Sequence, residues 1–212
     1  MTIQIIESGT REGALKAWDK RGRGRKKKPE NIYYYDFPLG TYNKARNKDW
    51  KKLSQEERDA LLGYTKLQYV DINRYLRNKD EERLRNQKRT LNGEKVPLKD
   101  YIGYIDSAIA KGTPLEANTY LYRVISKRPE WQKVGVTFTD LGFVSTSVDI
   151  DTPAKIYPSK KVYYRIKAPK GTKGIFASSD NPREFEFLLP RGTKFKVTGI
   201  TGESIDLDIV ND

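Results

Sequence analysis

The sequence predicts an α+β fold in which helices come first and β-strands follow. Up to about residue 117, apolar side chains recur at the three- and four-residue intervals that are typical of helices. From Asn118 onward, short segments rich in β-branched and aromatic residues predict strands. Helices followed by a run of strands indicate an α+β domain, and 212 residues suit one such domain with an additional arm.

The first 48 residues are expected to form a basic arm with one short helix. Residues 10–20 place Leu15 and Trp18 on one helical face. Residues 21–28 contain six cations, and the Gly residues between the Arg residues disfavour a helix, so a flexible linker is expected. Such a segment either docks on nucleic acid or an acidic protein surface, or only keeps the chain soluble.

Three helices are expected between residues 54 and 110. The first begins with a capping box, in which Ser54 and Glu57 satisfy each other's backbone amides, and Gly63 is expected to end it. The other two helices are expected at residues 65–76 and 99–110. The charged segment between them, residues 78–97, is expected to be a loop or a frayed helix.

Eight strands are expected in the second half of the chain. They cover residues 119–125, 136–138, 144–147, 162–167, 174–177, 184–189, 194–200 and 204–210. Simple alternation along the sixth of them directs Phe185 and Phe187 into the core and places Glu184 and Glu186 together on the opposite face.

The chain has no Cys and no His, which excludes several kinds of chemistry. Disulfides, thiolate nucleophiles, imidazole acid–base groups and the usual zinc sites are all ruled out. The formal net charge is +13, and the first hundred residues hold 25 Lys and Arg against 15 Asp and Glu. An anionic ligand or partner is therefore expected, whereas the sequence offers no membrane span or signal peptide. A cytoplasmic location is expected, with export by a signal-independent route left open.

Four short motifs carry residues that could do chemistry. They are Tyr122-Arg123, Ser145-Thr146-Ser147, Tyr157-Pro-Ser-Lys160 and Glu184-Phe185-Glu186. Taken singly, each has an ordinary explanation: a cation paired with a core carboxylate, a polar strand, a loop and an exposed strand edge. Their order along the chain is the more informative feature.

In this order the motifs resemble the arginine–serine–glutamate class of mono-ADP-ribosyltransferases. That class includes the actin-modifying components of binary toxins and the Rho-modifying exoenzymes. The resemblance covers about residues 50–212 and extends to the segment 188–197. In the helical part, Tyr64, Tyr69 and Asn73 have the spacing of nucleotide-contacting residues in the actin-modifying members.

The resemblance implies a fold and a reaction. Residues 49–212 would form the ADP-ribosyltransferase domain, a helical lobe packed on a two-sheet β-sandwich with NAD⁺ in the cleft between the lobes. ADP-ribose would pass from NAD⁺ to a protein side chain as nicotinamide leaves. Glu186 would stabilise the positive charge that develops on the ribose, Ser145 would hold Glu186 or the cofactor, and Arg123 would meet the pyrophosphate.

The resemblance also implies the remaining site residues and the acceptor. Glu184 would face the acceptor, and an E-x-E motif points to arginine in a target protein. The residues implied to bind NAD⁺ are Tyr64, Tyr69, Asn73, Tyr122, Arg123, Ser145, Thr146, Tyr157, Lys160 and Glu186, with no metal. A bacteriophage protein, a bacterial effector or a toxin would suit such an enzyme. Two alternatives stay open: an NAD⁺ glycohydrolase or nucleic-acid-directed transferase of the same fold, and a catalytically silent, basic nucleic-acid-binding module.

Overall fold

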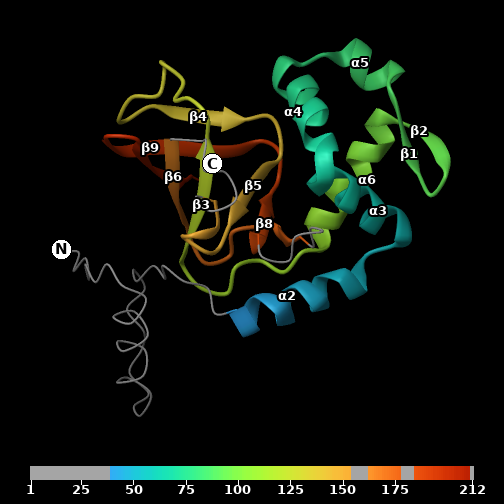
Figure 1. The fold of residues 1–212 in the computed structure, drawn as a ribbon, viewed down its shortest axis with the longest axis horizontal. Helices are drawn as coiled ribbons and strands as arrows, with labels where there is room; N and C mark the ends of the chain where they lie inside the picture. The colour runs from blue at the N-terminus through green and yellow to red at the C-terminus, as the bar shows by residue number, and fades with distance from the viewer. Residues whose placement is uncertain (1–38, 154–161, 178–183, 211–212) are drawn as a thin grey trace.

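The fold consists of a helical lobe beside a large β-sheet, with one further helix lying under both (Figure 1). The computed structural model describes residues 39–153, 162–177 and 184–210. Within these ranges no helix combines the length and the hydropathy needed to cross a membrane. The predicted helix at residues 10–20 and the basic segment 21–28 lie outside the described residues, as do Tyr157 and Lys160.

The helices follow the predicted order, and α2 and α5 are present in addition to the expected ones. They are α2 (Leu39–Lys52), α3 (Gln55–Gly63), the π-helix η1 (Tyr64–Gln68), α4 (Tyr69–Asn78), α5 (Glu81–Asn86) and α6 (Leu98–Lys111). The predicted capping box at the start of α3 is confirmed. The Ser54 amide donates to the Glu57 carboxylate at 2.7 Å, and the Glu57 amide donates to the Ser54 hydroxyl at 3.3 Å.

Gly63 is the last residue of α3, as expected from the sequence, but the helical backbone does not stop there. Its backbone is right-handed helical, and the chain continues through η1 into α4. A Cβ atom at Gly63 would lie only 2.2 Å from the hydroxyl oxygen of Tyr101. The glycine is therefore needed for the close approach of α3 and α6, and not for a left-handed C-terminal cap.

The charged segment after α4 is more ordered than expected. It contains α5 and a hairpin of β1 (Lys88–Leu91) and β2 (Glu94–Pro97). The turn is Asn92-Gly93, and both residues have positive φ, 51° and 83°. Asn-Gly is the preferred pair for a two-residue hairpin turn of this kind. The expectation of a loop or frayed helix was wrong because the charged strands lack apolar alternation.

All eight predicted strands are present in one sheet. They are β3 (Thr119–Ile125), β4 (Thr137–Asp140), β5 (Val144–Ser147), β6 (Val162–Ala168), β7 (Ile175–Phe176), β8 (Glu186–Leu189), β9 (Thr193–Thr201) and β10 (Ser204–Ile209). Their order is β4-β9-β10-β6-β3-β5-β8-β7, with β6 and β10 parallel and the other neighbours antiparallel. The predicted α+β class is confirmed.

The two sheets expected from the sequence are two parts of this single sheet. They are joined where β3 meets β5, through the one pair Tyr122 and Ser147. Side chains from both parts, including Ile166 on β6 and Phe187 on β8, belong to one hydrophobic core.

Helix α2 crosses the boundary expected between the arm and the domain. The boundary was placed after residue 48, inside this helix. Tyr42 is 2% exposed and packs in the core of the sheet, and the buried Asp49 accepts hydrogen bonds from the amide and hydroxyl of Thr113. The packed part of the chain therefore begins earlier than expected, and the division into two domains stays a prediction.

Candidate active site

A serine and a glutamate meet where β5 and β8 run side by side. These strands pair Ser145 with Leu188 and Ser147 with Glu186, which brings the Ser145 hydroxyl over the Glu186 side chain. The hydroxyl donates to Oε1 of Glu186 at 2.5 Å. Glu186 is only 4% exposed, and its second oxygen, Oε2, is buried without a hydrogen-bond partner among the described residues. A buried carboxylate oxygen without a partner is unfavourable unless a ligand supplies a donor.

The environment raises the pKa of Glu186 from 4.5 to about 7. Burial is the main cause, because it disfavours the charged form, and the neighbouring Glu184 carboxylate adds to it. The Ser145 hydrogen bond and the Arg123 guanidinium act in the opposite direction. Glu186 thus titrates near neutral pH, as acid–base and electrostatic groups in active sites often do.

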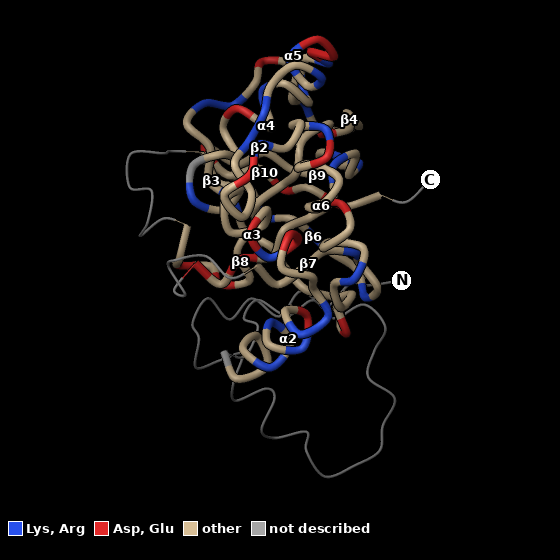
Figure 2. Tube along the Cα trace, turned by 90° about the vertical axis from the view of Figure 1, so that its right-hand side faces the viewer, with Lys and Arg blue, Asp and Glu red and all other residues tan. Residues whose placement is uncertain are grey.

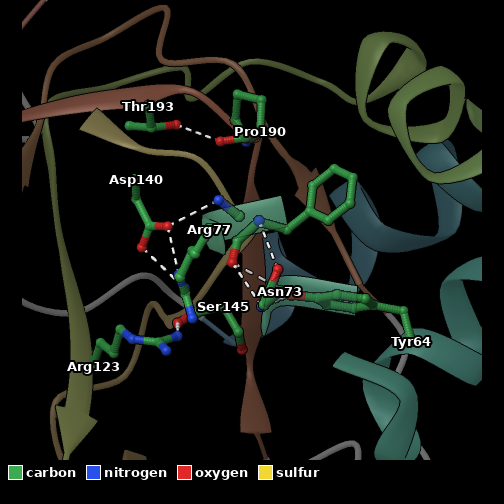
Figure 3. Close-up of polar contacts among 10 residues, drawn as sticks. Tyr64, Asn73, Arg77, Arg123, Asp140, Ser145, Pro190 and Thr193 are labelled. Atoms are coloured by element: carbon green, nitrogen blue, oxygen red, sulfur yellow. Dashed lines mark hydrogen bonds and ion pairs between the residues drawn. The ribbon is translucent and has the colours of Figure 1, made fainter. Parts of the chain in front are cut away.

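Arg123 reaches the same place from β3. Its Nη1 donates to the carbonyl oxygen of Ser145 at 2.7 Å (Figure 3). The side chain is partly exposed, and its described hydrogen bond is to a backbone carbonyl and not to a core carboxylate. Arg123 therefore does not play the purely structural part of a buried ion pair. The structure brings Arg123, Ser145 and Glu186 together as the motifs predict.

Glu184 and Glu186 are not successive residues on one face of a strand. The strand β8 begins only at Glu186, and Phe185 has φ 46°, in the left-handed region that a phenylalanine rarely adopts. Phe185 is partly buried and Glu184 is half-buried, and burial raises the pKa of the Glu184 carboxyl. Simple alternation failed here because the backbone turns at Phe185, a strained conformation of the kind found at functional sites.

The helical lobe fixes the start of β5 through Asn73. Its Nδ2 donates to the Tyr64 hydroxyl at 2.9 Å and to the Phe143 carbonyl at 3.2 Å, and its Oδ1 accepts from the Phe143 amide at 2.9 Å (Figure 3). Tyr64 is 1% exposed and packs edge-on against the rings of Phe143 and Tyr69. The side-chain polar groups of Tyr64 and Asn73 are thus engaged within the protein. Both residues were expected to contact NAD⁺, and here they position the strand that carries Ser145.

Two other residues that were expected to contact the cofactor, Tyr122 and Thr146, are buried. The Thr146 hydroxyl donates to the Phe187 carbonyl at 2.5 Å, and its side chain is buried on the face of β5 opposite Ser145. Tyr122 is 6% exposed and pairs with Ser147 at the junction of the sheet. In this structure Thr146 joins β5 to β8, and its hydroxyl is not directed toward Glu186.

Sequence reasoning missed a bidentate ion pair that joins the two lobes. Arg77 on α4 donates to both carboxylate oxygens of Asp140 on β4, at 2.8 and 3.0 Å (Figure 3). Oδ1 of Asp140 also accepts from the Gly142 amide at 2.9 Å. The one available signal was that Arg77 lies one helical turn after Asn73 and shares its face. Reasoning from the sequence also missed Tyr42, which approaches the site from α2.

The comparisons with known proteins agree with this geometry. A sequence model of the ADP-ribosyltransferase exoenzyme family matches residues 40–208. The chain belongs to the ADP-ribosyltransferase exoenzyme family. The resemblance drawn from the motifs is therefore confirmed at the level of the family, and the grouping of Arg123, Ser145 and Glu186 is consistent with the arginine–serine–glutamate class. No curated protein sequence matches the chain.

Solved structures of several toxins share the fold. Plx2a, an ADP-ribosyltransferase toxin from Paenibacillus larvae, is 21% identical over 85% of this chain and 100% of its own, with a TM-score of 0.67. C3stau2 from S. aureus, solved with NAD, is 18% identical over 87% and 100%, with a TM-score of 0.64. The enzymatic component C2-I of the Clostridium botulinum C2 toxin is 22% identical over 86% of this chain and 50% of its own, with a TM-score of 0.63.

Proposed function

We propose that this protein transfers ADP-ribose from NAD⁺ to an arginine side chain of a target protein. Membership of the exoenzyme family supports NAD⁺-dependent mono-ADP-ribosylation. The observation that carries the proposal is the state of the Glu186 carboxylate: one oxygen is held by Ser145, and the other is buried without a described partner. That oxygen fits a hydroxyl donor such as those of the ribose in NAD⁺.

Glu186 would act on the bond between nicotinamide and ribose. Positive charge develops on the ribose as this bond breaks, and an ionised carboxylate in a buried site stabilises it more strongly than water does. Ser145 keeps the carboxylate in place, and the adjacent Arg123 guanidinium favours its ionised form. Arg123 is also a partly exposed cation beside this site, suited to the pyrophosphate of the dinucleotide.

Glu184 supports arginine as the acceptor. It lies two residues before Glu186, outside the strand, and is half-buried with a raised pKa. A carboxylate in that position attracts a guanidinium and can take up its proton as the new bond forms. The alternative of a catalytically silent module is less favourable, because a purely structural fold gains nothing from a buried carboxylate oxygen without a partner.

The proposal is tested by following the label from NAD⁺ that is labelled in its adenosine part. The protein is incubated with this NAD⁺ and a bacterial lysate, and the products are treated with protease or with nuclease. The expected result is label that protease releases and that mass spectrometry maps to arginine. Label in nucleic acid, label on another side chain, free ADP-ribose alone or uncleaved NAD⁺ would each contradict the proposal.

A further inference from the structure

Helix α2 places a buried tyrosine directly under the glutamate motif. Tyr42 is 2% exposed, and its hydroxyl donates to the carbonyl of Ala177 at 2.7 Å. The Glu186 carbonyl oxygen lies 3.4 Å from the same hydroxyl. Burial and the nearby Glu186 carboxylate raise the pKa of Tyr42, so the hydroxyl remains a donor at all ordinary pH values.

The Tyr42 ring reaches both ends of the connection between β7 and β8. Phe176 ends β7, and its ring centroid is 5.5 Å from that of Tyr42 at an angle of 83°. Phe185 directly precedes β8, and its ring is also 5.5 Å away, at 87°. The two ends are further joined by the Ala177 amide, which donates to the Glu186 carbonyl at 3.0 Å. One side chain thus contacts the residues on both sides of the segment that leads to Glu184.

Phe185 needs such a support because its backbone is strained. A non-glycine residue in the left-handed region is energetically unfavourable and persists only where the surroundings fix it. The φ of 46° at Phe185 determines how Glu184 is set relative to Glu186. If Phe185 relaxed to negative φ, Glu184 would turn away while Glu186, held in β8 by strand pairing, would stay in place.

The opposite end of α2 is anchored to the helical lobe. Asp49 accepts from the amide and the hydroxyl of Thr113 at 2.9 and 2.6 Å, and Lys52 donates to the Lys111 carbonyl at 2.9 Å. Figure 2 shows α2 under β7 and β8. The C-terminal part of α2 is therefore attached to the end of α6, and the N-terminal part holds Tyr42 against the sheet.

We propose that Tyr42 is a positioning residue that keeps Phe185 in its left-handed conformation and so sets Glu184 for the transfer step. This inference rests on the proposed function, in which Glu184 acts on the acceptor and Glu186 on NAD⁺. Tyr42 touches neither the substrate nor the acceptor in this account. Its loss should therefore impair transfer more than cleavage of NAD⁺.

The test compares Tyr42→Leu and Tyr42→Phe with Tyr101→Phe. Tyr101 is the matched control, because its buried hydroxyl also donates to a backbone carbonyl, that of Ala60 at 3.0 Å, but lies within the helical lobe. For each variant the rates of NAD⁺ hydrolysis and of transfer to a small guanidino acceptor are measured. Tyr42→Leu should lower transfer relative to hydrolysis by about tenfold or more, since small displacements in active sites have effects of this size. Tyr42→Phe, which keeps the ring, should retain most of the ratio, and Tyr101→Phe should leave it unchanged.

A ratio that is unchanged in Tyr42→Leu, or lowered equally by Tyr101→Phe, would overturn the inference. A second measurement does not depend on activity: amide hydrogen exchange in residues 184–189 should rise in both Tyr42 variants and not in Tyr101→Phe. If wild-type protein transfers no ADP-ribose, the proposed function fails, and exchange alone then decides on Tyr42. Unchanged exchange there would show that Tyr42 does not hold the segment.

Discussion

The effect of Glu186→Gln on the free energy of unfolding, relative to wild type, should be more favourable at high pH than at low pH. The pKa of this carboxyl is about 7 in the folded protein and 4.5 without the fold. A raised pKa means that the folded state binds the proton of Glu186 more tightly than the unfolded state does. The stability gained from this proton is complete below the unfolded-state pKa and is lost as the pH rises through the folded-state pKa of about 7. At about 1.4 kcal/mol for each pH unit, the ionised Glu186 costs about 3 kcal/mol above that pH. Gln carries no charge at any pH and avoids this loss.

The assay is urea unfolding of wild type and Glu186→Gln at about pH 4 and about pH 8. The difference in unfolding free energy between variant and wild type should increase by about 3 kcal/mol in favour of the variant over this interval. Glu184→Gln is the matched control and should show a smaller change, because that carboxyl is only half-buried. A Glu186→Gln difference that is the same at both pH values would refute the assignment of a buried, raised-pKa carboxyl.

Three further substitutions test the hydrogen bond to this carboxyl, the packing around Asn73 and, as a distant reference, the cap of α3. Ser145→Ala removes the donor to Glu186, so the pH at which NAD⁺ cleavage is half-maximal should rise by about one unit, and an unchanged pH profile would contradict the hydrogen bond. Gly142→Ala places a Cβ atom 2.7 Å from Oδ1 of Asn73 and should destabilise the protein by about 1–3 kcal/mol in urea unfolding, whereas an unaffected midpoint would show that the Asn73 side chain can move aside. Ser54→Ala removes a helix cap far from the site and should cost about 1 kcal/mol without changing the pH profile.

The sequence predicted those parts of the fold in which local pattern and tertiary structure agree. The capping box at Ser54 and the strand at residues 119–125 were correct because their signals are contained in a few neighbouring residues. Gly63 marked the end of α3 correctly but did not mark a break in the helical backbone, because a close approach by Tyr101, a residue far along the chain, requires the glycine. The sequence pattern alone could not reveal that contact, and glycine more often marks a helix end than a tight helix pair.

The candidate site was predictable in its chemistry and less so in its geometry. The motifs identified Arg123, Ser145 and Glu186, which the structure brings together. The turn at Phe185 and the support from Tyr42 were not predictable, since both depend on contacts between segments more than a hundred residues apart. The alternation of apolar and polar residues in a sequence does not reveal a strained backbone angle.

The central claim is that Glu186 serves cleavage of NAD⁺ and Glu184 serves transfer to arginine. The most direct measurement is the pair of rates, NAD⁺ hydrolysis and transfer to a small guanidino compound, in Glu184→Gln and Glu186→Gln, with folding of each variant verified. Glu184→Gln should lose transfer by about 100-fold or more, the effect typical of a lost acid–base group, and keep hydrolysis near the wild-type rate. Glu186→Gln should lose both activities. Transfer at the wild-type rate in Glu184→Gln, or hydrolysis that survives in Glu186→Gln, would contradict the account.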